Sequence, residues 1–203
     1  MPVTLTATDY AWFPERFSAL AEAYCLTLVE RVSPVELLDR LDARERRVLT
    51  GVDALVEPAY GAWEDGGGDD AFVGVAAVGD WSLVVEPNGL LGVTEAVLTP
   101  LSRGRTVVSH FRNVNALNLF FWYVDGDLRL QFEPLFPDSR VGSDPDGLVE
   151  VMRRVGFDLD GDDYDRCDEA AFALAAHLTG VRFTADLLAS AEYLCGTVRL
   201  PGR

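Results

Sequence analysis

Alternation of apolar and polar residues predicts a series of β-strands in the middle of the chain, over 24–29, 72–78, 81–86, 105–111, 118–124 and 127–133. Two pairs of these strands are separated by only two residues. Gly79 with Asp80, and Asp125 with Gly126, suit tight hairpin turns. Because a hairpin joins antiparallel neighbours, the pattern predicts a mostly antiparallel central sheet of about five strands.

Helical spacing of apolar residues appears on both sides of these strands. Helices are expected over 13–23, from 34 onward, over 51–63, over 94–101, and as three C-terminal helices from about 144, namely 145–155, 168–179 and from 185. Ser33 and Glu36 form a capping box, Thr184 suits an N-cap, and Gly180 suits the residue after a helix. The helix from 34 is expected to carry Arg40, Arg44, Arg46 and Arg47 at its end.

Strands in the middle with helices at both ends indicate an α+β fold. The length of 203 residues favours a single domain over 1–203. The segment 64–70 combines three glycines with four acids and is expected to be a flexible surface loop.

The charge balance excludes several kinds of partner. The chain has 33 acidic and 17 basic side chains and a formal net charge of -16, and its 49% hydrophobic residues are enough for a folded core. Nucleic acid and anionic membranes both attract clustered cations, so neither is an expected partner. A protein with a basic surface is expected instead, because opposite charge accelerates encounter.

The beginning of the chain and its cysteines bear on the compartment. The first residues up to Asp9 carry no cationic segment of the signal-peptide kind. Cys25, Cys167 and Cys195 are odd in number and far apart, which favours reduced thiols over a disulfide framework. We therefore expect a cytoplasmic protein.

The hairpin around Asp125 raises the question of a surface. Counting outward from the turn places Trp122 opposite Arg129 and Phe120 opposite Gln131. A helix that covers these aromatic side chains, with Arg129 stacked on Trp122, explains this arrangement. The alternative is a partly open interface, in which Trp and Arg are preferred anchors.

His110 is the main candidate for chemistry. It precedes Arg112, Asn113 and Asn115 near the expected end of a strand, and Glu86 and Glu133 end other strands. Such a group suits anion binding, or general-base catalysis by His110 with Glu133. The alternative is structural: the asparagines make turn hydrogen bonds, and Arg112 pairs with a carboxylate.

An acidic segment resembles a calcium-binding loop in part. It places Asp158, Asp160 and Asp162 at positions 1, 3 and 5 and Glu169 at position 12. Position 6, however, is Asp163, where such loops require glycine. The other interpretation is an acidic connector whose last carboxylates favour the start of the next helix. No nucleotide, hydrolase or zinc motif is present, so no cofactor is expected.

Several stretches carry a resemblance to a known family, and they cover 81–89, 109–116, 132–137 and 178–181. From about Tyr24 to Cys195 the chain resembles an uncharacterised actinobacterial family of the Streptomyces type, a domain of unknown function. The resemblance implies a cytoplasmic, single-domain protein. It assigns no activity and no catalytic residue.

Size, acidity and the lack of a catalytic motif favour a non-enzymatic binding protein of the immunity or antitoxin kind, with a protein partner that is basic. The alternative is a small-ligand binder or enzyme centred on His110, Arg112, Glu86 and Glu133. The sequence does not define the oligomeric state.

Overall fold

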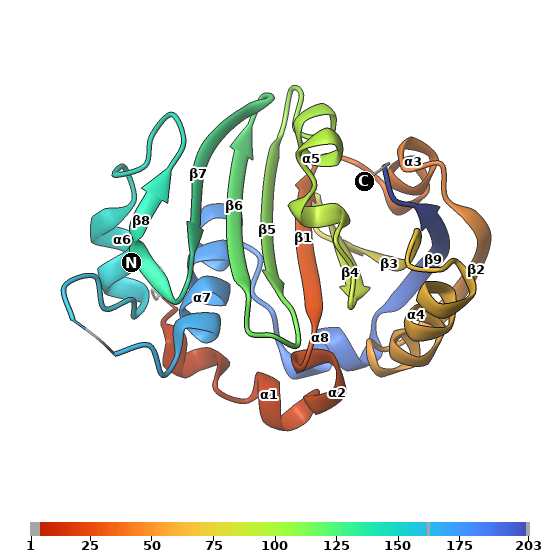
Figure 1. Ribbon diagram of the computed structural model, residues 1–203, viewed down its shortest axis with the longest axis horizontal. Helices are drawn as coiled ribbons and strands as arrows, with labels where there is room; N and C mark the ends of the chain where they lie inside the picture. The colour runs from red at the N-terminus through yellow and green to blue at the C-terminus, as the bar shows by residue number, and fades with distance from the viewer. Residues whose placement is uncertain (1–4, 162, 202–203) are drawn as a thin grey trace.

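The computed structural model describes residues 5–161 and 163–201 (Figure 1). The helices are η1 (Ala7–Tyr10), α1 (Phe13–Arg16), α2 (Ser18–Ala21), α3 (Pro34–Arg40), α4 (Asp53–Asp65), η2 (Leu91–Val93), α5 (Glu95–Leu101), α6 (Val149–Val155), α7 (Cys167–Thr179) and α8 (Ala185–Ser190). The strands are β1 (Tyr24–Glu30), β2 (Arg44–Thr50), β3 (Asp70–Val78), β4 (Trp81–Pro87), β5 (Thr106–Arg112), β6 (Asn118–Val124), β7 (Asp127–Glu133), β8 (Phe136–Val141) and β9 (Glu192–Arg199).

All the strands belong to one antiparallel sheet of nine strands, in the order β2-β9-β3-β4-β1-β5-β6-β7-β8. The α+β class is confirmed, but the expected sheet of about five strands is wrong. The strands β2, β8 and β9 were missed. In particular, α3 ends at Arg40, and Arg44 begins an edge strand instead of ending a helix. Asp42, with φ of 52°, makes the turn between them.

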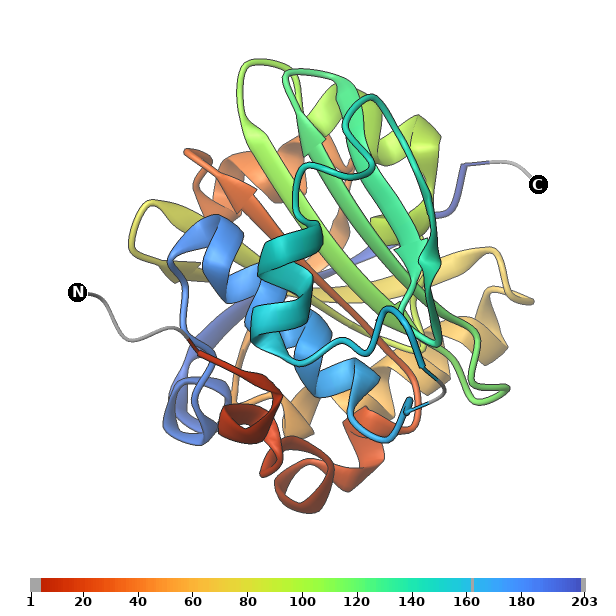
Figure 2. The same ribbon diagram turned by 90° about the vertical axis from the view of Figure 1, so that its left-hand side faces the viewer.

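The sheet separates two hydrophobic cores. The larger core packs side chains of η1, α1, α2, α4, α6, α7 and α8 against one face, and the smaller core packs α3, η2 and α5 against the other. Figure 2 shows α6 and α7 lying over the strands on the larger-core side, where α7 also contacts η1 and β5. Alanines make up much of the buried face of α7, and these small side chains allow close approach to the sheet.

The hairpin of β6 and β7 has the expected turn but a different register. Asp125 and Gly126 both have positive φ, at 52° and 81°, as a tight hairpin turn requires. Beyond the first two pairs, however, Arg129 is an extra residue, so Trp122 faces Leu130 instead of Arg129. Such a bulge shifts every later pair by one residue. The expected pairing of Phe120 with Gln131 is therefore wrong.

Several local predictions can be compared with the structure. The Ser33 hydroxyl accepts from the Glu36 amide at 3.2 Å, and the Thr184 hydroxyl accepts from the Leu187 amide at 3.0 Å, so both caps are confirmed. Gly180 has φ of 72° after α7, as expected. The helix expected over 13–23 is divided at Phe17. The helix expected from 145 begins only at Val149, after the unexpected strand β8.

Of the loop expected over 64–70, only 66–69 lie outside a helix or strand. The helix α4 ends at Asp65, three glycines turn the chain, and β3 begins at Asp70. Asp69 pairs with Arg199 at 2.9 Å, and Asp70 pairs with Arg44 at 3.1 Å.

Within the described residues, every helix is too short or too polar to cross a bilayer.

Candidate functional site

A chain of polar side chains, which is buried in the sheet and partly exposed at its end, runs from the sheet to the beginning of α7. The hydroxyl of Tyr24 lies 3.4 Å from His110 Nδ1, and His110 Nε2 lies 2.8 Å from Asn118 Oδ1. The amide nitrogen of Asn118 donates to Asp168, which also accepts from the Arg112 guanidinium. This chain links β1, β5 and β6 to the first turn of α7.

Strand register places these side chains together. Tyr24 pairs with Arg112 across β1 and β5, and Arg112 pairs with Asn118 across β5 and β6. The intervening turn is closed by Asn113, whose Oδ1 accepts from the Asn115 amide at 2.9 Å and from the Leu117 amide at 3.0 Å. Asn113 therefore makes hydrogen bonds within the turn, as expected in the structural alternative to a catalytic or anion-binding site.

The surroundings of His110 favour its neutral form. The side chain is only 1% exposed, and burial lowers the pKa of His110, although Asp168 and the hydrogen bond with Asn118 act to raise it. Burial also favours the neutral form of Tyr24, because it raises the pKa of the phenol. Both ring nitrogens of His110 have partners, so the imidazole is held in place and has no free atom to offer a substrate.

The four residues of the expected small-ligand site do not form one cluster. Glu86 is the cross-strand neighbour of Cys25, so it faces the smaller core, whereas Tyr24 and His110 face the larger one. Its carboxylate accepts from the Leu91 amide at 2.9 Å and from the Gly92 amide at 3.0 Å.

Glu133 is also separated from His110. It follows Phe132 along β7, and Phe132 pairs with Phe120, which in turn pairs with His110. Cross-strand partners share a face and adjacent residues alternate, so Glu133 points away from His110. Only Arg112 of the expected group joins His110, through Asn118 and Asp168.

Of the two aromatic residues proposed for an interface, one is buried and the other is partly exposed. Phe120 is fully buried, and Trp122 is partly buried against the larger core. The guanidinium carbon of Arg129 lies 5.6 Å from the centre of the Trp122 ring, and Arg129 Nη2 binds Asp144 Oδ2 at 2.8 Å. Asn115 is exposed. This arrangement matches the covered alternative for the hairpin.

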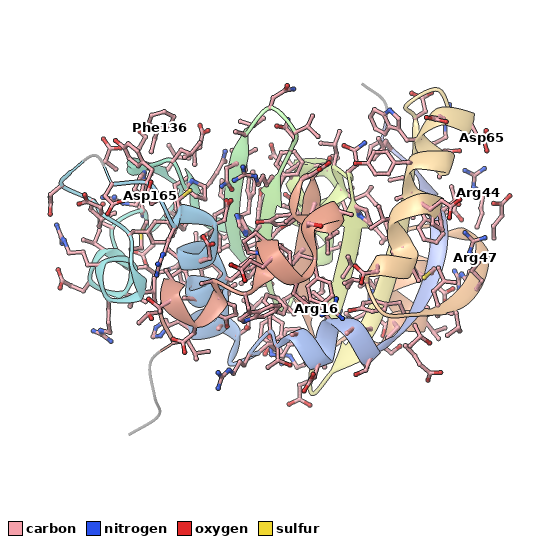
Figure 3. All side chains as sticks on the ribbon, turned by 90° about the horizontal axis from the view of Figure 1, so that it is seen from below. Arg16, Arg44, Arg47, Asp65, Phe136 and Asp165 are labelled. Atoms are coloured by element: carbon pink, nitrogen blue, oxygen red, sulfur yellow. The ribbon has the colours of Figure 1, made fainter. Side chains whose placement is uncertain are left out.

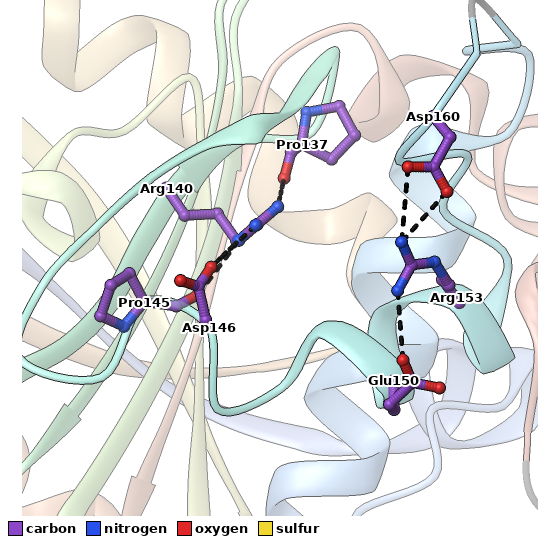
Figure 4. A network of polar contacts seen from close by, with 7 residues as sticks. All are labelled: Pro137, Arg140, Pro145, Asp146, Glu150, Arg153 and Asp160. Carbon is purple, nitrogen blue, oxygen red and sulfur yellow. Dashed lines mark hydrogen bonds and ion pairs between the residues drawn. The ribbon is translucent and has the colours of Figure 1, made fainter.

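The expected calcium ligands do not converge in the described residues, and Asp162 lies outside them. The two carboxylate oxygens of Asp158 accept from the amides of Asp160 and Asp163, both at 3.3 Å. The Asp160 carboxylate turns to Arg153 at 3.0 Å (Figure 4). Within 5–161 and 163–201, no group of three His, Cys, Asp or Glu side chains could hold a metal ion.

Two cavities flank the segment that leads into α7. The larger has a volume of about 410 Å³, and the smaller about 250 Å³. The larger lies between this segment, η1 and the turn before β8, and its charged lining residues are Asp158, Asp163, Asp165 and Arg166. The smaller lies beside the polar chain, and its charged lining residues are Arg112, Asp165, Asp168 and Glu169. We call these two cavities and their lining residues the acidic end.

The two arginines of the acidic end have local partners. Arg112 pairs with Asp168, and Arg166 Nη1 lies 3.3 Å from the Thr8 hydroxyl. By contrast, Asp163 and Asp165 form no ion pair with a described residue. Neighbouring arginines are engaged too, because Arg153 pairs with Glu150 and Asp160, and Arg140 with Asp146 (Figure 4). The two cavities therefore keep an excess of negative charge.

The opposite end of the molecule carries exposed arginines together with acids. Arg44 and Arg47 of the edge strand β2 lie there, far from Phe136 and Asp165 at the acidic end (Figure 3). Arg44 pairs with Asp70 at 3.1 Å, and the Arg47 guanidinium lies 5.0 Å from the centre of the Phe72 ring. Strand β2 is also bulged between Arg44 and Arg47. The charged side chains and the bulge both discourage the pairing of another strand at this edge.

The fold and the acidic end define an α+β protein with an open antiparallel sheet and negatively charged cavities at one end. The chain belongs to a family of unknown function, DUF6461, whose model matches residues 3–202. This confirms the expected membership of an uncharacterised family. Neither a curated protein nor a solved structure matches the chain.

Proposed function

We propose that this protein is a non-enzymatic binding protein of the cytoplasm, similar to immunity proteins and antitoxins in size and acidity, and that it recognises a protein partner with a basic surface. The observation that carries the proposal is the acidic end, where Asp163 and Asp165 line hollows and form no ion pair with a described residue. A hollow surface of one charge attracts a partner of the opposite charge and raises its rate of association.

Two of the four residues expected for a small-ligand site, Glu86 and Glu133, face away from His110. His110 itself is buried and engaged at both nitrogens. These observations support binding by the exposed acidic side chains over catalysis by the expected cluster.

The proposal includes a source and a compartment. The absence of lysine and isoleucine suits the codon usage of a GC-rich genome, and we infer an actinobacterial source. The three cysteines are free and buried, which supports a reducing compartment. A neighbouring gene for a secreted or cytotoxic basic protein would support the immunity function, whereas a biosynthetic gene cluster would speak against it.

Affinity capture from the native cytoplasm tests the function. The bait is the full chain, compared with the double variant Asp163→Asn and Asp165→Asn, in which the side-chain oxygens remain as acceptors. The matched control, Glu64→Gln with Asp65→Asn, removes the same charge from an exposed segment at the other end. We expect the full chain to capture a basic protein at low salt and to release it at high salt. The captured amount should fall several-fold with the Asp163→Asn and Asp165→Asn variant, and should not change with the control variant. Absence of a basic protein from the wild-type eluate would overturn the proposal.

A further inference from the structure

The carboxylate of Glu86 is enclosed by the segment that follows it. Glu86 lies near the end of β4, and the chain turns at Asn88, with φ of 54°, so that η2 lies against β1 and β5. Glu86 Oε2 accepts from the Leu91 amide at 2.9 Å, and Oε1 accepts from the Gly92 amide at 3.0 Å. Each oxygen of the carboxylate therefore holds one amide of η2.

The surroundings of Glu86 provide no positive charge. Strand β1 presents the Cys25 thiol, whose pKa is raised by burial and by the nearby charge of Glu86, and the Ser109 hydroxyl of β5 lies 3.3 Å from the Cys25 sulfur. Neither η2 nor the turn before it has a titratable side chain, and Glu95, the acid of α5, acts on Tyr123 instead. Among the described residues, no arginine forms an ion pair with Glu86. Only hydrogen bonds offset the loss of hydration when this buried carboxylate ionises.

Apolar side chains separate Glu86 from a larger cavity on the same face of the sheet. Glu86 and Thr27 line a void of about 10 Å³, which is no larger than one water molecule. The larger cavity, of about 330 Å³, lies between α3, α5 and the end of β9, and α3 and α5 stand apart in Figure 1. Its charged lining residues are Arg40, Asp42 and Arg199, all of them exposed, so the cavity is open to water. The two spaces share four walls, Leu41, Leu91, Val97 and Leu101. Movement of Leu91 together with η2 therefore connects Glu86 to the larger cavity.

We propose that η2 is a pH-sensitive latch, which stays closed over β1 and β5 while Glu86 is protonated and opens when Glu86 ionises, so that the carboxylate meets water through the cavity between α3 and α5. The proton passes to solvent, and the open state supplies the hydration that the closed state withholds from the charge. This inference concerns the smaller-core side of the sheet and does not rest on the proposed function.

The direction of the effect follows from the two states of the carboxyl group. Burial raises the pKa of Glu86 from 4.5 to about 7 in the closed state, whereas a hydrated carboxyl group in the open state keeps its ordinary value. The closed state is therefore most favoured below about pH 4.5, and it loses this advantage as the pH rises to about 7. Above that pH both states have lost the proton, and opening no longer changes.

Native-state hydrogen exchange of the full chain, followed by NMR, tests the latch, because the amides of Leu91 and Gly92 bond to the carboxylate. We expect the protection factors of these two amides to fall by at least about tenfold between about pH 5 and pH 8. They should depend little on low concentrations of denaturant, since a local opening exposes little surface. The amide of Val84, inside the sheet, should be better protected and should exchange with the strong denaturant dependence of global unfolding.

The variant Glu86→Gln cannot ionise, so its Leu91 and Gly92 protection factors should be the same across this pH range, whatever their level. Glu64→Gln, which removes an exposed acid of α4, should keep the wild-type pH dependence. In the wild type, opening should level off at the pH where the side-chain carbon signal of Glu86 titrates. Exchange of Leu91 and Gly92 only by global unfolding, protection that is independent of pH, a pH dependence that persists in Glu86→Gln, or levelling off away from the Glu86 titration would each overturn the inference.

Discussion

The Nε2 atom of His110 lies 2.8 Å from the Oδ1 atom of Asn118, and this contact determines what both residues do. The Asn118 side chain accepts from the histidine ring and donates to Asp168, so it joins the sheet to α7. Asn118 is fully buried, and a buried amide that satisfies two polar neighbours fixes their positions. His110 is consequently a positioning residue for the beginning of α7 and for the smaller cavity beside it.

Replacement of Asn118 should destabilise the protein. Asn118→Ala leaves a buried nitrogen of His110 and one oxygen of Asp168 without their partner, which costs about 2 kcal/mol or more in the free energy of unfolding. Denaturant unfolding monitored by circular dichroism measures this change. The exposed Asn115 provides the control, and Asn115→Ala should change stability by less than about 0.5 kcal/mol. Equal stability of the two variants would contradict the structural role of Asn118.

Asp168 should tune the titration of His110. The carboxylate raises the pKa of His110 against the larger effect of burial, so Asp168→Asn should lower that pKa further. The ring carbon signals of His110, followed by NMR across pH, report the change. Asp165→Asn removes the same charge three residues earlier and should leave the His110 titration as in the wild type. An unchanged or raised pKa in Asp168→Asn would show that the Asp168 carboxylate does not act on the ring.

Apolar alternation was enough to predict six of the seven inner strands, but neither of the two edge strands of the sheet. The strand β2 reads Arg44–Thr50 with almost every side chain exposed, so it has no buried face to produce a period of two. The edge strand β8 is irregular for the same reason. The strand β9 does alternate, because Tyr193 and Cys195 are buried, and this signal could have been found.

The polar chain was predictable only in part. His110 and Arg112 were recognised together because they lie close in sequence, whereas Asp168 is 56 residues beyond Arg112 and meets it only through the packing of α7. A bulge such as that at Arg129 also has no marker in the residue pattern, which is why the hairpin register was wrong. Long-range packing, and not local propensity, decides both features.

Gly92 should tolerate no side chain. A Cβ atom there would collide with Thr27, Cys25 and Ser109, which lie on β1 and β5 beneath η2. Gly92→Ala should therefore lower the free energy of unfolding by about 1–3 kcal/mol, as overpacking of a core does. Gly61 lies inside α4 with open space around its Cβ position, and Gly61→Ala should raise stability by about 0.5–1 kcal/mol. Thermal unfolding of the two variants should shift in opposite directions, and a Gly92→Ala protein as stable as the wild type would show that η2 moves to accommodate the methyl group.

Glu86 should make the stability depend on pH. Its carboxyl group is 1% exposed, and burial raises its pKa from 4.5 to about 7, partly opposed by the hydrogen bonds from Leu91 and Gly92. Between these values the unfolded chain has lost the proton that the folded chain keeps, so rising pH favours unfolding. Glu86 should contribute a loss of roughly 3 kcal/mol between about pH 4.5 and 7, using about 1.4 kcal/mol for each pKa unit.

The variant Glu86→Gln isolates this contribution, because other groups titrate equally in both proteins. The free energy of unfolding, measured in denaturant from pH 4.5 to 8, should fall more steeply for the wild type than for Glu86→Gln. The difference should level off above about pH 7, where the folded protein has also lost the proton. Glu64→Gln, an exposed charge of the same type, should follow the wild-type curve. Parallel curves for the wild type and Glu86→Gln would mean that Glu86 ionises in the folded protein as it does in water, and that its burial against the Leu91 and Gly92 amides carries no penalty for the charge.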